Sequence, residues 1–312
     1  MFKKTVILLE NDYRYHYPVM LKECLEGLNI NPAGIYVDVT FGGGGHSRAI
    51  LEKLTTGHLY SFDQDADARL ESEKITSENF TFIAANFRHI KKYLRVHGVK
   101  QVNGILADLG ISSHQIDTPE RGFSTRFDAI LDMRMNTNTG LSAKEVVNEY
   151  SVEDLHKIFG MYGELKNAKT VANAIATARA SAHLETIHDL KNALQSFAPR
   201  HKEHKFFAQV FQALRIEVNE EMKVLEDFLE QVPEVLAPEG RLVVMAYHSL
   251  EDRPVKNYIR SGKFSGEVEK DFFGNEIKPL QSITRKPIEA SPEEIALNPR
   301  ARSAKLRIAE KK

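Results

Sequence analysis

The stretch Ile35-Tyr-Val-Asp-Val-Thr-Phe-Gly-Gly-Gly-Gly-His46 decides the fold. Its apolar, β-branched beginning predicts a short strand, the glycines predict a tight turn, and residues 46–54 have the apolar spacing of an amphipathic helix. Because glycine has no Cβ atom, such a turn lets backbone N–H groups approach a polar ligand closely. A nucleotide-like cofactor is the favoured ligand, although the spacing matches neither Gly-x-Gly-x-x-Gly nor a nucleotide triphosphate loop. A glycine turn that binds nothing is the alternative.

A second predicted strand, residues 57–63, ends in an acid about 20 residues beyond the glycines. A βαβ unit places at this point the carboxylate that accepts hydrogen bonds from ribose hydroxyls. Asp63 is therefore the candidate ribose ligand. It could instead cap the following helix, as could Asp65 and Asp67.

Strands and helices continue to alternate along the chain. Strands are predicted at residues 80–84, at residues 102–108, which end in Asp108, and at residues 242–247, which His248 follows. This alternation predicts a doubly wound α/β sheet with a ligand crevice at the carboxyl ends of its strands. The glycine turn, Asp63, Phe87 and Asp108 all fall at that edge.

Residues 112–200 interrupt the alternation with a polar loop and several helical patterns, so we predict a helical insertion after the fourth strand. Residues 1–111 and 201–312 would form the sheet domain. Residues 204–231 predict one long helix, on which Gln212, Arg215 and Asn219 share a face that either meets a ligand or is solvated. Residues 279–285 and 304–308 predict two further short strands beside a cluster of basic residues, for which a solvated surface is the usual explanation.

Composition narrows the class of protein. The chain has 312 residues, of which 42% are hydrophobic and 27% charged, and its formal charge is −1. That balance argues mildly against a nucleic-acid binder unless basic residues cluster locally. The single cysteine, Cys24, excludes an internal disulfide and a multi-cysteine zinc site. The apolar run at residues 6–9, after Lys3 and Lys4, is too short for a signal peptide or a membrane span. We therefore expect a cytoplasmic protein with no membrane contact. We also expect no bound metal.

Several strings, found in order from about residue 13 to the end of the chain, resemble one family, the bacterial 16S ribosomal RNA cytosine-N4 methyltransferases. The strings are His16-Tyr-Pro-Val-Met-Leu21, Thr40-Phe-Gly-Gly-Gly-Gly-His-Ser47, Asp108-Leu-Gly-Ile-Ser-Ser113 with Gln115 and Asp117, Arg121-Gly-Phe-Ser124, Leu131-Asp-Met-Arg-Met135, Phe211-Gln-Ala-Leu-Arg-Ile-Glu-Val-Asn219, Tyr247-His-Ser-Leu-Glu-Asp-Arg253 and Asn298-Pro-Arg-Ala-Arg-Ser303. The sequence departs from the family at Gly43, where many members carry another residue.

The resemblance implies a Rossmann-like class I methyltransferase sheet whose helical insertion recognises the substrate. It implies S-adenosyl-L-methionine as cofactor and cytosine 1402 of 16S rRNA, in an assembled or nearly assembled small (30S) ribosomal subunit, as substrate. The family's cofactor-binding positions carry over onto Gly44, Gly45, His46, Asp63, Phe87, Asp108 and Gln115. The loop would meet the methionine carboxylate, Asp63 the ribose, and Phe87 and Asp108 the adenine region, although Phe87 could equally be core packing.

Methylation of a cytosine amino group needs acceptors for its hydrogens, because the N4 lone pair is delocalised into the ring. Related amino-methylating enzymes place an acid or amide, two prolines and an aromatic residue after the fourth strand, whereas residues 108–113 contain neither proline nor an aromatic residue. We therefore predict that Ser112 or Ser113 and His248 line the target pocket, with Tyr247 or Phe123 stacking on a flipped base. A purely structural role for His248 is the alternative.

Contacts with the RNA are expected from local basic patches, which a near-zero net charge permits. The residues predicted to contact RNA or to order the pocket are Arg134, Arg215, Asn219, Tyr247, Arg300 and Arg302. We expect a monomer or a homodimer. Two other functions share parts of the pattern: a nicotinamide-dependent dehydrogenase, which the glycine spacing disfavours, and a non-catalytic ribosome-assembly factor on a methyltransferase scaffold.

Overall fold

A computed structural model describes residues 18–138 and 140–312. The chain forms two compact units, one that ends at Gly110 and resumes at Val224, and one that spans Ile111–Lys223. The predictions for Lys3, Lys4 and residues 6–9, and the beginning of the string at His16, lie outside the described residues. Within the described ranges, no helix combines the length and apolar character that crossing a membrane would require.

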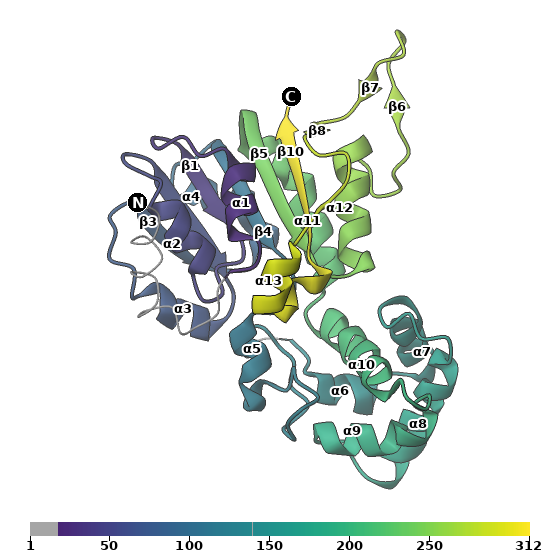
Figure 1. The fold of residues 1–312 in the computed structure, drawn as a ribbon. Helices are drawn as coiled ribbons and strands as arrows, with labels where there is room; N and C mark the ends of the chain where they lie inside the picture. Colours follow the sequence, from purple (N-terminus) through teal and green to yellow (C-terminus); the bar gives the residue numbers. More distant parts are fainter. Residues whose placement is uncertain (1–17, 139) are drawn as a thin grey trace. The chain divides into compact units, whose positions relative to one another are not determined.

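The first unit is built on an eight-stranded sheet with the order β3-β2-β1-β4-β5-β10-β8, and β9 pairs with β10 beside this path (Figure 1). Strands β1 to β5 are parallel to one another, whereas β10 is antiparallel to β5, β8 and β9. The strands are β1 (Ile35–Asp38), β2 (His58–Asp63), β3 (Phe80–Ala84), β4 (Val102–Asp108), β5 (Leu236–Ala246), β8 (Leu280–Ser282), β9 (Ile288–Glu289) and β10 (Lys305–Lys311). The strand order reverses between β1 and β4, which is where doubly wound sheets bind their ligands.

Helices cover both faces of this sheet because its central strands are apolar on both sides. One face packs against α4 (Ile90–Val96), the part of α11 (Glu221–Val235) from Val224 onward, and α12 (Ser249–Ser261). The other face packs against α1 (Leu21–Leu28), α2 (Gly45–Leu51) and the η5 turn (Pro299–Ser303). Cys24 is buried in this second layer. The remaining elements of the unit are α3 (Ala66–Ser72), η2 (Phe87–His89), β6 (Glu269–Lys270), β7 (Glu276–Ile277) and α13 (Pro292–Leu297).

Two details of the later strands differ from the prediction. The strand predicted at residues 242–247 begins earlier, because residues 238–241 also belong to β5, where Glu239 has a φ of 63° and the pairing with β4 shifts between Val102 and Gly104. A strand can contain such an irregularity when one extra residue is accommodated by a bulge. The two short strands expected near the end of the chain are β8 and β10, and β10 is the longer.

The second unit consists of helices joined by loops, and its described residues form no strand beyond one isolated bridge between Ile130 and Thr186. Apolar residues of all its longer helices form one core, which includes Leu155, Phe159, Ile175 and Leu190. Its elements are α5 (Ser113–Asp117), η3 (Pro119–Arg121), α6 (Ala143–Glu149), α7 (Val152–Met161), α8 (Ala168–Ser181), α9 (Ile187–Leu194), η4 (Gln195–Phe197) and α10 (Glu203–Val218). The fold class predicted from the sequence, a Rossmann-like α/β sheet with a helical insertion after the fourth strand, is confirmed.

The insertion ends later than residue 200, because α10 belongs to the helical unit. Phe206, Phe207, Val210 and Leu214 of α10 are buried in the core of that unit, which explains the difference. The long helix expected over residues 204–231 is also two helices. Asn219 ends α10, its side-chain amide donates to the carbonyl of Arg215, and the next residue has a left-handed φ of 49°.

Candidate functional site at the carboxyl ends of the parallel strands

Polar side chains gather where β1, β2, β4 and β5 end, because parallel strands point their carboxyl ends to one edge of a sheet. Asp38, at the end of β1, is 1% exposed and accepts a hydrogen bond of 2.6 Å from the hydroxyl of Ser47. Burial raises the pKa of Asp38, while the hydrogen bonds from Ser47 and Thr40 lower it. The Thr40 hydroxyl in turn accepts from the N–H of Asp108 at 2.7 Å. Asp38 thus ties the glycine loop to α2 and, through Thr40, to β4, a role that the sequence alone did not suggest.

The glycine loop leads from β1 into α2. Gly44 has a φ of 76° and precedes the first residue of α2, and a Cβ atom on it would lie 2.6 Å from the Phe41 ring. By contrast, a Cβ atom on Gly43 would meet nothing within 4 Å. A residue other than glycine is therefore tolerated at position 43 but not at position 44, which accounts for the departure noted at Gly43.

Asp63, at the end of β2, holds the loop from the other side. Its carboxylate accepts from the N–H of Gly42 at 2.8 Å and from the N–H of Asp65 at 2.9 Å. The helix cap is Asp65, whose carboxylate accepts from the N–H of Asp67, so the capping alternative for Asp63 does not hold. Burial raises the pKa of Asp63 to about 6, against the lowering effect of the two N–H donors. Since an ionised carboxylate has about four acceptor positions, capacity for further donors remains.

Asp108, at the end of β4, accepts a hydrogen bond of 2.8 Å from the hydroxyl of Tyr247. Its other carboxylate oxygen lies 3.9 Å from Nδ1 of His46, whose Nε2 is 3.1 Å from the carbonyl oxygen of Val19. Because a carbonyl only accepts, Nε2 of His46 carries the proton. Burial raises the pKa of Asp108 to about 6 and lowers that of His46. The pKa of Tyr247 is raised well above 10 by burial and by the Asp108 charge, so its hydroxyl remains a donor.

His248 and Glu251 follow β5 at the same edge. Nε2 of His248 is 3.1 Å from one carboxylate oxygen of Glu251, and the other oxygen accepts from the N–H of Tyr247 at 2.8 Å. Glu251 is only 2% exposed and therefore holds both residues in place. Donation from Nε2 to Glu251 makes Nδ1 of a neutral His248 ring a hydrogen-bond acceptor. Sequence reasoning missed Glu251, although an acid three residues into a helix that follows a strand is a recognisable capping signal.

Phe87 opens the η2 turn after β3. It is partly buried, and its ring packs edge to face on Phe228 of α11, with centroids 5.3 Å apart and an interplanar angle of 84°. The packing alternative for Phe87 therefore has a contact in its favour, and its role at an adenine ring stays a prediction.

In the helical unit, Ser112 and Gln115 bind each other. The Ser112 hydroxyl accepts from the N–H of Gln115 at 3.2 Å, and the Gln115 side chain accepts from the N–H of Ser112 at 3.0 Å. This reciprocal pair is a capping box at the start of α5. Phe123 is buried in the core of the same unit.

Three residues predicted to contact RNA have structural partners within this unit. Arg134 forms a two-pronged ion pair with Asp132, at 2.9 and 2.8 Å, and Arg215 forms one with Glu221, at 2.7 and 3.0 Å. The Asn219 side chain donates to the carbonyl of Met133 and accepts from the N–H of Met135. The Arg134 and Asn219 contacts order the loop before α6. The predicted roles of the three residues in binding RNA or in ordering the pocket stay predictions.

Arg300 and Arg302 lie in the first unit, on the η5 turn. Arg302 is exposed and Arg300 is half-buried. Their predicted contact with RNA stays a prediction.

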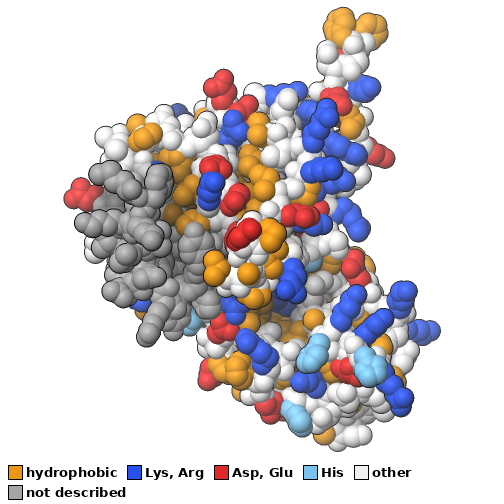
Figure 2. Space-filling model, viewed as in Figure 1, with side chains coloured by type: hydrophobic (Ala, Val, Ile, Leu, Met, Phe, Trp, Pro, Cys, Tyr) orange, Lys and Arg blue, Asp and Glu red, His pale blue; other side chains and the backbone are white. Residues whose placement is uncertain are grey.

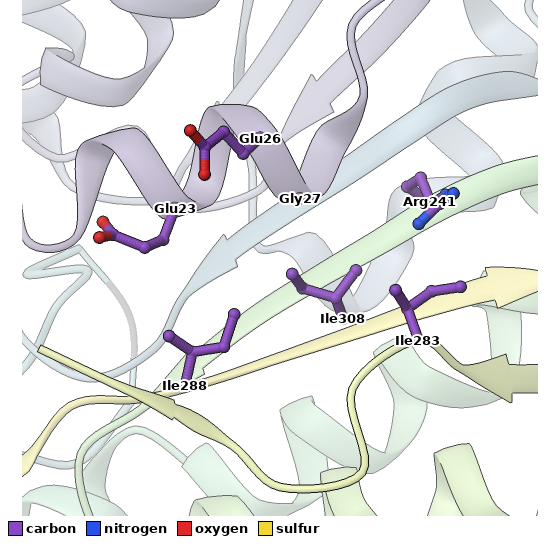
Figure 3. Close-up of a pocket in the computed structure, with 7 residues that line it drawn as sticks. All are labelled: Glu23, Glu26, Gly27, Arg241, Ile283, Ile288 and Ile308. Atoms are coloured by element: carbon purple, nitrogen blue, oxygen red, sulfur yellow. The ribbon is translucent and has the colours of Figure 1, made fainter.

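A shallow pocket of about 160 Å³ lies on the α1 face of the sheet rather than at its carboxyl edge (Figure 3). Figure 3 shows Glu23 and Glu26 on α1 across from three isoleucines, with Arg241 on β5. Gly27 lets the helix approach closely, since a Cβ atom there would lie 2.8 Å from the Ile308 side chain. None of the predicted site residues lines this pocket, which therefore adds nothing to the candidate site.

The strand order, with an antiparallel strand beside β5, is that of a Rossmann-like α/β sheet. The particular family follows from sequence comparison: a profile of the MraW methylase family matches residues 13–312, and the chain belongs to this family. The family resemblance seen in the sequence is thereby confirmed. The family uses S-adenosylmethionine, which confirms the predicted cofactor and removes the dehydrogenase alternative.

Relatives match over almost their whole length. A ribosomal RNA small subunit methyltransferase H of Cytophaga hutchinsonii is 59% identical over 297 residues, which cover 95% of this chain and 99% of the relative. The protein of the same name from Parabacteroides distasonis is 54% identical over 304 residues, covering 97% and 99%. Among solved structures, an rRNA methylase from Streptococcus thermophilus aligns with a TM-score of 0.41 and 13% identity over 93% of each chain.

Proposed function

We propose that the protein transfers a methyl group from S-adenosylmethionine to the exocyclic N4 of cytosine 1402 in 16S rRNA of the small ribosomal subunit, in the cytoplasm. The observation that carries this proposal is the 59% identity to a relative named as a small-subunit rRNA methyltransferase, over 95% of the chain. The choice of N4 and of cytosine 1402 rests on the family strings described above. The surroundings of Asp108 and His248 suit the chemistry, because they offer hydrogen-bond acceptors to an amino group.

The residues at the carboxyl edge fit the cofactor. Gly44, Gly45 and His46 would line the methionine end, and Asp63 would accept hydrogen bonds from the ribose hydroxyls with the acceptor capacity that Gly42 and Asp65 leave. Bound S-adenosylmethionine supplies an electrophilic methyl group on its sulfonium. Gln115 keeps its predicted place among the cofactor-binding residues, in addition to its role in the capping box.

The amino group of the target cytosine needs hydrogen-bond acceptors in the pocket. Nδ1 of His248 would accept one amino hydrogen of the cytosine, because Glu251 holds the proton on Nε2. That hydrogen bond would direct the N4 lone pair toward the methyl group, and the proton that N4 loses on methylation would pass to water. Nδ1 of His248 is buried in this structure, so the base would reach it only after neighbouring side chains move. Tyr247 would border the base, with its hydroxyl fixed on Asp108.

The test is methyl transfer from radiolabelled S-adenosylmethionine to small subunits from a strain that lacks this enzyme, followed by digestion and identification of the labelled nucleoside. We expect the label in N4-methylcytidine at position 1402. Label in another nucleoside would refute the N4 assignment. No transfer to subunits, despite measurable cofactor binding, would instead support the assembly-factor alternative.

Variants test the two proposed pocket residues. His248→Ala is expected to lower turnover with cofactor binding intact, and His97→Ala, a change at an exposed histidine, serves as its control. Ser112 could act as a helix cap or in the target pocket, so two variants are compared. Ser112→Asn keeps a good helix cap without the hydroxyl, whereas Ser112→Ala removes both. Turnover restored by Asn would assign Ser112 to the cap alone. Wild-type turnover in both alanine variants at His248 and Ser112 would end the assignment of these residues to the pocket.

A further inference from the structure

Between α12 and β8 the chain leaves the sheet and returns as a two-stranded arm, residues 263–278. Strands β6 and β7 pair antiparallel along it, with Glu269 opposite Ile277 and Lys270 opposite Glu276. Figure 1 shows the arm projecting from the side of the sheet that α12 covers. Nothing in the proposed methyl transfer uses this arm.

The tip of the arm carries two exposed aromatic rings. Phe272 is 98% exposed and Phe273 is 84% exposed, and their rings stand nearly perpendicular, with centroids 5.7 Å apart and an angle of 88° between their planes. Single exposed apolar side chains are common, but adjacent ones form an apolar patch, and such patches mark interaction sites. Figure 2 shows this hydrophobic tip standing clear of the surface below it.

The turn that presents the two rings is held by its own hydrogen bonds. One carboxylate oxygen of Asp271 accepts from the N–H groups of Phe273 and Asn275, each at 2.8 Å, and the other accepts from the Asn275 amide at 2.9 Å. The N–H of Asp271 donates to the carbonyl of Asn275 at 2.9 Å. The rings are therefore presented by an ordered turn rather than by a loose loop, which reduces the entropy cost of binding.

The root of the arm is fixed to α12. The Asn257 side chain donates to the carbonyl of Phe264 at 2.7 Å, and the Arg260 guanidinium donates to the carbonyl of Gly266. The Tyr258 and Phe264 rings stack with centroids 5.1 Å apart. The outer face of α12 and the arm thus form one continuous element.

The charges along this element differ between its two parts. On α12, the exposed residues Arg253, Lys256 and Arg260 recur at three- and four-residue spacing and form a basic stripe. On the arm, Lys263 pairs with Glu269 and Lys278 pairs with Glu276, while Asp271 is engaged in the turn. The positive potential of the element therefore comes mainly from the stripe, and Figure 2 shows Lys and Arg side chains gathered below the tip.

We propose that this element is a second RNA-binding surface, distinct from the residues that meet the target cytosine. The stripe on α12 binds backbone phosphates of the rRNA, and an unpaired base stacks on Phe272 or Phe273. Basic residues followed by exposed aromatic rings are the combination that single-stranded RNA requires, since phosphates need cations and every base offers a π-face. A protein pocket would explain the aromatic tip but not the stripe that continues from it. The inference rests on the proposed function, because the RNA concerned is that of the substrate subunit.

The phosphate part is tested by the salt dependence of binding to small subunits. We compare the wild-type protein, Arg253→Gln/Lys256→Gln and a control, Lys53→Gln/Lys100→Gln, which changes exposed lysines in the loops before β2 and β4, outside the arm and α12. Removing two cations that bind phosphates should reduce the slope of log K against log salt concentration by about 1.4. The control should keep the wild-type slope. A slope in the stripe variant equal to that of the control would overturn the stripe as a phosphate site.

The aromatic part is tested by two substitutions that separate stacking from apolar burial. Phe272→Leu/Phe273→Leu keeps apolar side chains but removes the rings, and is expected to weaken subunit binding about tenfold, as for the loss of one stacked base. Phe272→Trp/Phe273→Trp should bind at least as well as the wild type. Leu297→Ala, at a side chain that is 89% exposed elsewhere in the unit, is the control. Wild-type affinity in the Leu variant, or cross-linking of an azidophenylalanine at position 272 to a ribosomal protein instead of RNA, would overturn the proposal.

Methyl transfer by the wild-type protein separates this inference from the proposed function. If the wild-type protein methylates subunits while the tip and stripe variants bind like their controls, the arm inference fails and the methyltransferase proposal stands. If the wild-type protein binds subunits but transfers no methyl group, the methyltransferase proposal fails, and the binding of the tip and stripe variants still decides the arm inference.

Discussion

Two adjacent glycines in the loop after β1 should respond very differently to the same substitution. Gly44 has a φ of 76°, and a Cβ atom there would lie 2.6 Å from Cζ of Phe41 and 2.9 Å from Nη1 of Arg48. Gly43 has a φ outside the left-handed region, and a Cβ atom there would meet nothing within 4 Å. Gly44→Ala and Gly43→Ala are thus a matched pair in which only the conformation and the available space differ.

The cost at Gly44 has two parts. An alanine held in the left-handed region costs about 1–2 kcal/mol. The contact with Phe41 adds an overpacking cost of about 1–3 kcal/mol, because this ring is only 3% exposed and packs against Phe80 and Phe82, so it has little room to move. Together they lower the free energy of unfolding by about 2–5 kcal/mol, whereas Gly43→Ala should change it by less than about 0.5 kcal/mol.

Urea unfolding of both variants and the wild type measures these differences directly, and calorimetric titration with S-adenosylmethionine shows whether the loop geometry also supports cofactor binding. We expect Gly44→Ala to bind the cofactor more weakly. Equal unfolding free energies for the two variants would refute the explanation from backbone conformation and space, whatever happens to cofactor affinity.

Three further predictions concern the acids at the carboxyl edge. Burial raises the pKa of Asp63 from 3.8 to about 6, so its contribution to stability is fully present below pH 3.8 and is lost as the pH rises through 6. Asp108 contributes a fall of the same sign, so unfolding measured from pH 3 to 7 should show a smaller loss of stability in Asp63→Asn than in the wild type, and equal losses would refute the assignment. Tyr247→Phe removes a hydrogen bond that lowers the pKa of Asp108. If ionised Asp108 takes part in catalysis, the acidic limb of the pH profile of kcat/KM should move to higher pH. An unchanged acidic limb would show that Asp108 takes no part. In Glu251→Gln, the side-chain oxygen still accepts from the N–H of Tyr247, so the amide nitrogen faces Nε2 of His248 and forces the histidine into its other tautomer. This change should lower kcat roughly 10- to 100-fold with unchanged cofactor affinity. If adding His248→Ala to this variant lowers kcat as much as it does in the wild type, the two residues act independently.

Much of the sheet could be predicted because its signals are local. Apolar β-branched runs that end in Asp63 and Asp108 mark parallel strands, and parallel strands bring their ends to one edge regardless of what lies between them. The same reasoning reached His248 after β5, although more than 100 residues separate it from Asp108. The family strings then supplied the cofactor, which spacing alone left open.

Predictions failed where a long-range contact decides the outcome. The apolar face of α10 suits either unit, and only its packing against the helical core assigns it there. The break after Val218 depends on Asn219, whose side chain donates to the carbonyls of Met133 and Arg215. The contact with Met133 spans more than 80 residues, so no local sequence pattern reveals it. For Ser112, chosen for its position after Asp108, the structure adds a capping box that sequence reasoning did not foresee, and its place in the target pocket stays a prediction. A helix start within a polar loop is easily overlooked, because the helix has only five residues.

The position of β10 has a consequence for synthesis of the chain. This strand lies between β5 and β8 and pairs along its length with β5, yet it begins at Lys305, 59 residues after β5 ends at Ala246. At a translation rate of about 5–20 residues per second, β5 therefore waits roughly 3–12 s with one edge open. An exposed, apolar strand edge of this kind invites pairing with other chains. The growing polypeptide must therefore keep β5 covered in some other way until its proper neighbour emerges, and chaperones that hold extended apolar segments are the natural means.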